Sequence, residues 1–148
     1  MAVEPTPRGT YGARTLRMPG PLTRGMQGLV AWFARLTGTM LVLTTTGART
    51  GRRHSVVLGR FPEGGDAFLV VGSNAGSARH PAWLFNMAEH PDDVWAEVGR
   101  RKFKVRPELL SGAEREAAME RVVAASRGYA SYGRKTDREI PVVRLVPE

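Results

Sequence analysis

A seven-residue stretch at positions 47–53, Gly-Ala-Arg-Thr-Gly-Arg-Arg, has the composition of an anion-binding loop. Its glycines let the backbone N–H groups turn toward a ligand, and its guanidinium groups can donate paired hydrogen bonds to phosphate or carboxylate oxygens. A solvent-exposed turn between two strands has the same composition, so this loop alone does not establish a binding site.

A second polar segment, Ser-Asn-Ala-Gly-Ser-Ala-Arg-His-Pro at residues 73–81, points to the same chemistry. It leads into an expected helix, and the N-terminal end of a helix also favours anions. Two such loops at the ends of neighbouring strands indicate one shared site. On that helix Trp83 and Asn86 are three residues apart and share a face, so they would offer a stacking surface and a hydrogen-bonding amide. Packing in the core is the alternative role for Trp83.

Several other kinds of catalytic site are excluded by composition. The chain has no Cys, which removes thiolate nucleophiles, disulfides and thiolate metal sites. The three histidines, His54, His80 and His90, lack the spacing of metal ligands, so no metal site is expected. We expect His80 and His90 to lie on the surface, one at each end of the short helix. Any redox chemistry would have to come from a bound cofactor.

The excess positive charge lies entirely in the first 60 residues. The 148 residues hold 22 Lys+Arg against 14 Asp+Glu, a formal net charge of +8. Residues 1–60 contain nine arginines and a single acid, Glu4, whereas residues 61–148 have equal numbers of basic and acidic side chains. This distribution favours a polyanionic partner: a phosphate-bearing ligand, an anionic membrane surface or nucleic acid.

Periodicity and turn residues predict a flexible basic arm at residues 1–21, rich in Pro and Gly, and one domain at residues 22–148. Helices are expected at 22–38, at 81–89 and, from a Ser-x-x-Glu capping box, at 111–128. Strands are expected at 39–46, 54–61, 67–71, 94–98, 102–106 and 140–146.

The order of these elements favours an α+β fold in which an antiparallel sheet curls into a small barrel. The first three strands are expected to form a meander. The last strand is expected at an edge, because Pro141 cannot donate to a ladder. No signal-peptide core and no run of about 18 apolar residues are found, so a cytoplasmic location is expected.

Four ordered motifs together resemble the deazaflavin-dependent nitroreductase family of small actinobacterial proteins. They are Thr-Thr-Thr-Gly-Ala-Arg-Thr-Gly-Arg-Arg-His at 44–54, Gly-Ser-Asn-Ala-Gly at 72–76, His-Pro-Ala-Trp-Leu-Phe-Asn at 80–86 and Tyr-Ala-Ser-Tyr-Gly-Arg-Lys-Thr-Asp-Arg-Glu-Ile-Pro-Val-Val at 129–143. The resemblance implies a split β-barrel, like that of FMN-binding proteins, of about six mainly antiparallel strands with flanking helices. It also implies reduced coenzyme F420 as the hydride donor.

The resemblance assigns residues to three parts of the site by position. Residues that would hold the phosphate and acidic tail of the coenzyme are Arg49, Thr50, Gly51, Arg53 and His54. Residues that would flank the deazaflavin ring are Val56, Val57, Leu58, Val71, Gly72, Ser73, Asn74, Trp83 and Asn86. Ser73, Tyr129 and Tyr132 would lie near the acceptor and polarise its oxygen as negative charge grows there. For the two tyrosines, packing on the barrel is the alternative.

The implied function is that of an oxidoreductase transferring hydride from reduced F420 to a quinone, a nitroaromatic compound or an activated alkene. Residues 1–38 combine five arginines, one acid and an apolar stripe, so contact with an anionic membrane at its inner face is also expected, consistent with a lipid-soluble quinone as acceptor. Two alternatives stay open: a small basic nucleic-acid-binding protein, and a split-barrel protein that binds FMN or haem. No nucleic acid partner is expected, because residues 61–148 carry no excess positive charge.

Overall fold

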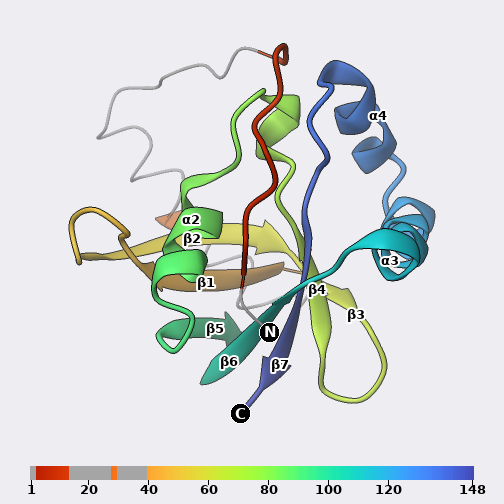
Figure 1. Ribbon diagram of the computed structural model, residues 1–148. Coiled ribbons are helices and arrows are strands. Elements are labelled where there is room, and N and C mark those ends of the chain that lie inside the picture. Colours follow the sequence, from red (N-terminus) through yellow and green to blue (C-terminus); the bar gives the residue numbers. More distant parts are fainter. Residues whose placement is uncertain (1–2, 14–27, 30–39) are drawn as a thin grey trace.

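Seven antiparallel strands form a curled sheet in the order β2-β1-β5-β6-β7-β4-β3 (Figure 1). The computed structural model describes residues 3–13, 28–29 and 40–148. Its strands are β1 (Met40–Thr46), β2 (Arg53–Gly59), β3 (Phe61–Pro62), β4 (Phe68–Val71), β5 (Val94–Val98), β6 (Arg101–Leu109) and β7 (Val142–Pro147). Its helical elements are the 3₁₀ turn η1 (Asn74–Gly76), α2 (Ala82–Glu89), α3 (Gly112–Ala125) and α4 (Gly128–Lys135). The helix expected at 22–38 lies outside the described residues, apart from positions 28 and 29, which are helical.

Strand β1 places the arginine-rich loop at one end of the sheet. It pairs with β2 from Met40 opposite Gly59 to Thr46 opposite Arg53, and on its other side it pairs with β5. Leu41 and Leu43 point to the inner face of the sheet and are completely buried. The β1–β2 hairpin therefore anchors both ends of the loop at residues 47–52.

The expected three-stranded meander is wrong at its third strand. Strand β4 pairs with β3 and β7, not with β2. The strand expected at 54–61 stops at Gly59, and Phe61 turns to pair with Leu69. Alternate residues of β4 enter two different core clusters, so both faces of this strand need cover. Phe68 belongs to the inner core cluster, with Leu41, Leu43, Leu84 and Met87, and Leu69 belongs to the outer core cluster, with Ala118, Val122 and Ile140.

Strand β7 lies inside the sheet and not at an edge as expected. It pairs with β6 on one side and β4 on the other. Pro141 precedes the first residue of the strand, so its missing N–H removes no ladder hydrogen bond.

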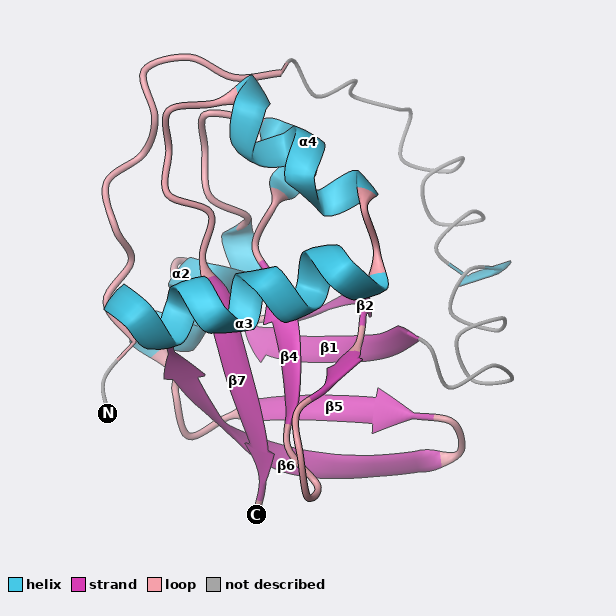
Figure 2. Ribbon diagram, turned by 90° about the vertical axis from the view of Figure 1, so that its right-hand side faces the viewer, coloured by secondary structure: helices cyan, strands magenta, loops and turns pink. Residues whose placement is uncertain are grey.

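The helices cover the two faces of the sheet separately. Helix α2 buries Leu84 and Met87 in the inner cluster, whereas α3 crosses β7 and β4 and buries Ala118 and Val122 in the outer one (Figure 2). The helix expected at 111–128 ends at Ala125, and α4 follows as a separate helix that the sequence did not predict. Ser111 precedes α3 as expected, but its side chain makes no capping hydrogen bond. No helix among the described residues is both long and apolar enough to span a bilayer.

Candidate functional site

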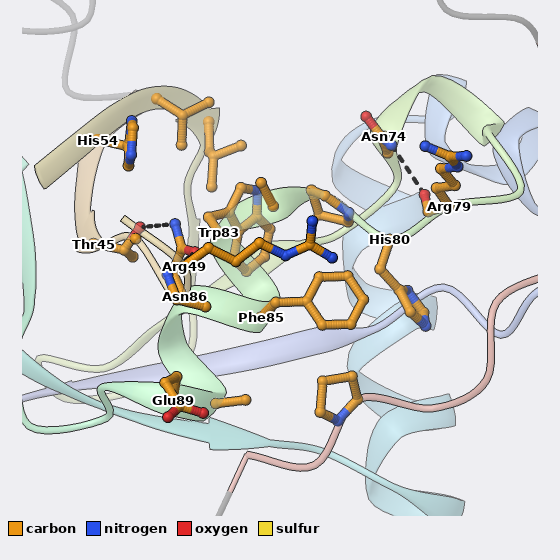
Figure 3. A pocket seen from close by; sticks show the side chains of 18 of the residues that line it. Thr45, Arg49, His54, Asn74, Arg79, His80, Trp83, Phe85, Asn86 and Glu89 are labelled. Carbon is orange, nitrogen blue, oxygen red and sulfur yellow. Dashed lines mark hydrogen bonds between the residues drawn. The ribbon is translucent and has the colours of Figure 1, made fainter. Parts of the chain in front are cut away.

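A cavity of about 1430 Å³ lies between the β1–β2 loop, β2, η1, α2 and the N-terminal segment, defined here as residues 3–13. We call it the main cavity. Figure 3 shows Arg49, Trp83, Phe85 and Asn86 on one part of its wall and Asn74, Arg79 and His80 on another. The two loops that the sequence singled out therefore line one space, as expected.

Most of the residues assigned from the sequence line the main cavity. Those that line it are Arg49, Thr50, His54, Val56, Leu58, Val71, Ser73, Asn74, Trp83 and Asn86. Those that do not are Gly51, Arg53, Val57, Gly72, Tyr129 and Tyr132. Their individual roles toward a ligand stay predictions.

Asn86 fixes the arginine-rich loop to α2. Its side chain is 7% exposed, its Nδ2 donates to the Thr45 hydroxyl at 3.0 Å, and its Oδ1 accepts from the Ala48 N–H at 3.0 Å. The loop is closed by a hydrogen bond from Gly51 N–H to the Gly47 carbonyl, and Gly51 has a φ of 68°, which favours glycine. Both ends of the Asn86 amide are thus engaged by the protein, so this residue positions the loop.

Asp93 supports the same loop from the side of β5. Its carboxylate accepts hydrogen bonds from the Thr46 hydroxyl at 2.5 Å and the Trp95 indole at 2.9 Å. These bonds hold the pKa of Asp93 below its usual value, so the group is charged at neutral pH. The negative charge attracts Arg53, 3.4 Å away, which explains why Arg53 does not line the main cavity. Sequence reasoning missed Asp93 because it lies 40 residues from Arg53.

The main cavity combines positive charge with an apolar wall. The described lining residues include three arginines, Arg8, Arg49 and Arg79, and one carboxylate, Glu89. Figure 3 shows the Arg49 side chain extending from its loop across the cavity. Apolar lining comes from Val56, Leu58, Val71, Trp83 and Phe85. Such a space suits a flat ring that carries an anionic extension.

Trp83 packs in the core and also lines the main cavity, and its stacking on a ligand stays a prediction. It is 6% exposed and belongs to the inner core cluster, and it also lines the main cavity. Phe85, on the same helix, is 44% exposed and contacts the His80 ring edge-on, with 6.1 Å between ring centroids. Phe85 is the more accessible aromatic surface, although the sequence did not single it out.

His80 is buried, so the expectation that it lies on the surface is wrong. It is 5% exposed, its Nδ1 lies 2.8 Å from Arg138 Nη1, and its Nε2 lies 2.7 Å from the Thr6 carbonyl. Burial lowers the pKa of His80, and the positive charge of Arg138 lowers it further. A neutral imidazole with its proton on Nε2 satisfies both neighbours, because a guanidinium only donates and a carbonyl only accepts.

Tyr129 and Tyr132 lie on α4 and contact the outer core cluster. Their rings meet edge-on at 5.6 Å, and Tyr129 meets Phe61 edge-on at 5.3 Å. Burial raises the pKa of Tyr129, so its hydroxyl stays protonated at neutral pH. Helix α4 packs against η1, where the Lys135 side chain meets Gly76, whereas the Tyr129 hydroxyl lies beside Gly59 at the end of β2. A role near the acceptor stays a prediction.

Sequence reasoning missed the contribution of the N-terminal segment. Pro5 and Arg8 line the main cavity, and Val3 is 4% exposed within the inner core cluster. No local signal could have placed them, because their partners lie about 70 residues away, as Thr6 and His80 illustrate. Among the described residues, no group of His, Asp or Glu side chains is arranged to hold a metal ion.

Replacing Asn86 with Ala is expected to lower the free energy of unfolding by about 2 kcal/mol, because Thr45 loses a buried hydrogen bond and Ala48 loses a partly buried one. Amide exchange at Ala48 should speed up. Denaturant unfolding and hydrogen exchange measure both effects. The control is Glu89→Ala, which removes an exposed side chain of the same helix. Unchanged stability and exchange in Asn86→Ala would show that Asn86 does not position the loop.

Comparison with known proteins identifies the family. The family model for F420H(2)-dependent quinone reductases matches residues 17–147. The F420H(2)-dependent quinone reductase Rv1261c of Mycobacterium tuberculosis is 31% identical over 137 residues, which cover 90% of this chain and 91% of that protein. The solved structure of the F420-H2 dependent reductase FDR-A is 36% identical, with a TM-score of 0.64, covering 72% of this chain and 93% of that one.

A more distant structure shares the fold alone. The haem storage protein HutZ of Vibrio cholerae is 14% identical, with a TM-score of 0.51, over 82% of this chain and 90% of that one. The expected α+β split-barrel fold and the resemblance carried by the four motifs are both confirmed. This chain belongs to the family of F420H(2)-dependent quinone reductases.

Proposed function

We propose that this protein binds reduced coenzyme F420 in the main cavity and reduces a quinone there. The observation that carries this proposal is one cavity with an arginine loop at one part and aromatic and aliphatic side chains beside it. The coenzyme, when bound, supplies hydride from carbon C5 of its deazaflavin ring. Family membership favours this function over the nucleic-acid-binding and FMN- or haem-binding alternatives.

The lining residues fit such a coenzyme. Arg49 and Thr50 can bind anionic oxygens, and the loop that carries them is held in place by Asn86. Val56, Leu58 and Trp83 offer a flat apolar surface for the ring. At about 1430 Å³ the cavity exceeds the roughly 300–1,000 Å³ of ordinary ligand pockets, so it has room for coenzyme and acceptor together. Holding both in adjacent positions is the main catalytic contribution of the protein.

Ser73 is the residue best placed to act on the acceptor. It lines the main cavity, and its hydroxyl makes no capping hydrogen bond with the η1 turn that follows. Donation from this hydroxyl to the acceptor oxygen would stabilise the negative charge that develops as hydride arrives. A hydroxyl is a weak acid at neutral pH, so solvent supplies the proton itself.

Isothermal titration tests coenzyme binding. We expect F420 to bind more tightly than FMN, because the arginine loop suits its acidic tail. Arg49→Ala should weaken F420 binding by about 1.5–3 kcal/mol, since it removes charge-assisted hydrogen bonds. The control is Arg52→Ala, because Arg52 is exposed on the same loop and does not line the main cavity. Equal effects of the two substitutions would remove Arg49 from the site, and tighter binding of FMN would overturn the coenzyme assignment.

Tyrosine variants test whether Tyr129 and Tyr132 orient the acceptor. If they do, changing either to Phe should lower turnover of a menaquinone analogue more than it weakens coenzyme binding. Changing either to Ala should also lower the melting temperature, because both rings contact the outer core cluster. Steady-state rates, coenzyme titration and thermal melting of the four variants give the comparison. Wild-type rates in both Phe variants would leave the tyrosines a packing role only.

The same proposal extends to a lipid-soluble quinone reached at an anionic membrane surface. Among the described residues, the large apolar side chains with the highest exposure are Tyr11 and Leu29, at 59% each. Both lie within the first 38 residues, where arginines outnumber acids. Exposed apolar side chains among cationic ones favour binding at the interface of an anionic bilayer.

Vesicle co-sedimentation measures this attraction at low salt. The protein should sediment with phosphatidylglycerol vesicles and not with phosphatidylcholine vesicles. Changing Arg14, Arg17 and Arg24 together to Gln should abolish it, whereas the same change at Arg100, Arg127 and Arg134 removes equal charge elsewhere and should retain most of the binding. Equal losses in the two triple variants would leave only a nonspecific effect of net charge, and no sedimentation would end the proposal.

A further inference from the structure

Arg138 is a buried cation whose partners are all uncharged. It is 4% exposed, and its donors reach the carbonyls of Ser77 at 3.0 Å, Gly72 at 3.0 Å and Ser73 at 2.8 Å, as well as His80 Nδ1. Within the described ranges, no carboxylate forms an ion pair with it. Burying a charge without a counter-ion is costly unless its donors are well satisfied. Here the four hydrogen bonds of the guanidinium group offset the cost of removing it from water.

The three carbonyls belong to the loop that forms one wall of the main cavity. Asn74 and Ala75, within this loop, have φ values of 43° and 54°, which non-glycine residues rarely adopt. Such backbone persists only where the surrounding structure holds it. Arg138 donates hydrogen bonds to the backbone on both sides of these two residues, to the Ser73 carbonyl before them and to the Ser77 carbonyl after them. It therefore fixes where Ser73 and Asn74 meet the cavity.

His80 extends the same network to the N-terminal segment. Its Nδ1 accepts from Arg138, and its Nε2 donates to the Thr6 carbonyl. Two further hydrogen bonds run alongside, from Gly9 N–H to the Ala78 carbonyl at 2.8 Å and from Ala13 N–H to the Gly76 carbonyl at 2.9 Å. Figure 1 shows this segment lying between the η1–α2 region and the chain that leads into β7. No side chain would fit at position 12, where a Cβ would overlap the backbone of residues 76–78.

We propose that Arg138 is a positioning residue that holds two walls of the main cavity: the loop carrying Ser73 directly, and the N-terminal segment carrying Pro5 and Arg8 through His80. This inference rests on the proposed function, because the walls matter only for ligands bound between them. Arg138 itself is not among the residues that line the cavity. It acts by fixing the residues that do.

Three substitutions test the proposal. Arg138→Lys keeps the charge but cannot reach three carbonyls and an imidazole at once. His80→Asn keeps an acceptor near the place of Nδ1 and loses the bond to Thr6. The control is Arg134→Lys, an exposed arginine on α4. Each variant is measured for melting temperature, F420 affinity, kcat and KM for a menaquinone analogue, and amide exchange at Gly9 and Ala13.

At temperatures well below melting, Arg138→Lys is expected to weaken F420 binding about tenfold, the equivalent of about 1.4 kcal/mol, and to speed exchange at Gly9 and Ala13. His80→Asn should speed the same exchange and raise KM for the quinone, because it loses the bond that holds the N-terminal segment. Arg134→Lys should match the wild type in every measurement.

The outcomes separate this proposal from the proposed function. A wild-type protein that does not bind F420 contradicts the function itself. A wild-type protein that binds F420, beside an Arg138→Lys variant with unchanged affinity and exchange, contradicts the positioning role alone. A lower melting temperature with unchanged affinity and KM would make Arg138 merely structural, and would also overturn the proposal.

Discussion

The packing of α2 against the inner face of the curled sheet is the constraint on which the site depends. This helix of eight residues buries Leu84 and Met87 completely in the inner core cluster. The same packing leaves Phe85 exposed and turns Trp83 and Asn86 toward the main cavity. Because the core fixes the rotation of α2, it also fixes the apolar wall of the main cavity and, through Asn86, the arginine loop. The same short helix therefore contributes both to the core and to the wall of the main cavity.

The arginines in and around the cavity are of two kinds, which differ in what balances their charge. Arg49 and Arg79 face the cavity, where an anionic ligand would provide their counter-charge. Arg53 is paired with Asp93, and Arg138 is buried among carbonyls behind the wall. The first kind is suited to binding, and the second maintains the shape of the space. Residue type alone does not distinguish them, since all four are arginines.

The sequence predicted those parts of the fold that depend on local signals. The β1–β2 hairpin, α2, the start of α3 and the meeting of two polar loops at one cavity follow from periodicity, turn residues and motifs, and the family is confirmed. Pairings between distant segments were missed: β4 beside β7, β7 inside the sheet, and the N-terminal segment against residues 76–80.

His80 shows why such features escape local reasoning. A histidine between Arg79 and Pro81 at the start of a helix is typical of a surface position. Its burial depends on Thr6 and Arg138, which lie 74 and 58 residues away. The roles of Ser73, Tyr129 and Tyr132 depend likewise on where the acceptor lies, which neither residue type nor spacing specifies.

The most direct test of the central claim is single-turnover oxidation of reduced F420 by the wild-type protein in the presence of a menaquinone analogue. The rate is followed through the visible absorbance of the oxidised deazaflavin, once with ordinary coenzyme and once with deuterium at the transferred C5 position. The account predicts oxidation that requires both protein and quinone and that slows with the deuterated coenzyme, because hydride passes directly between two ligands held together in the main cavity. Absence of protein-dependent oxidation, with tight binding of FMN instead, would contradict it.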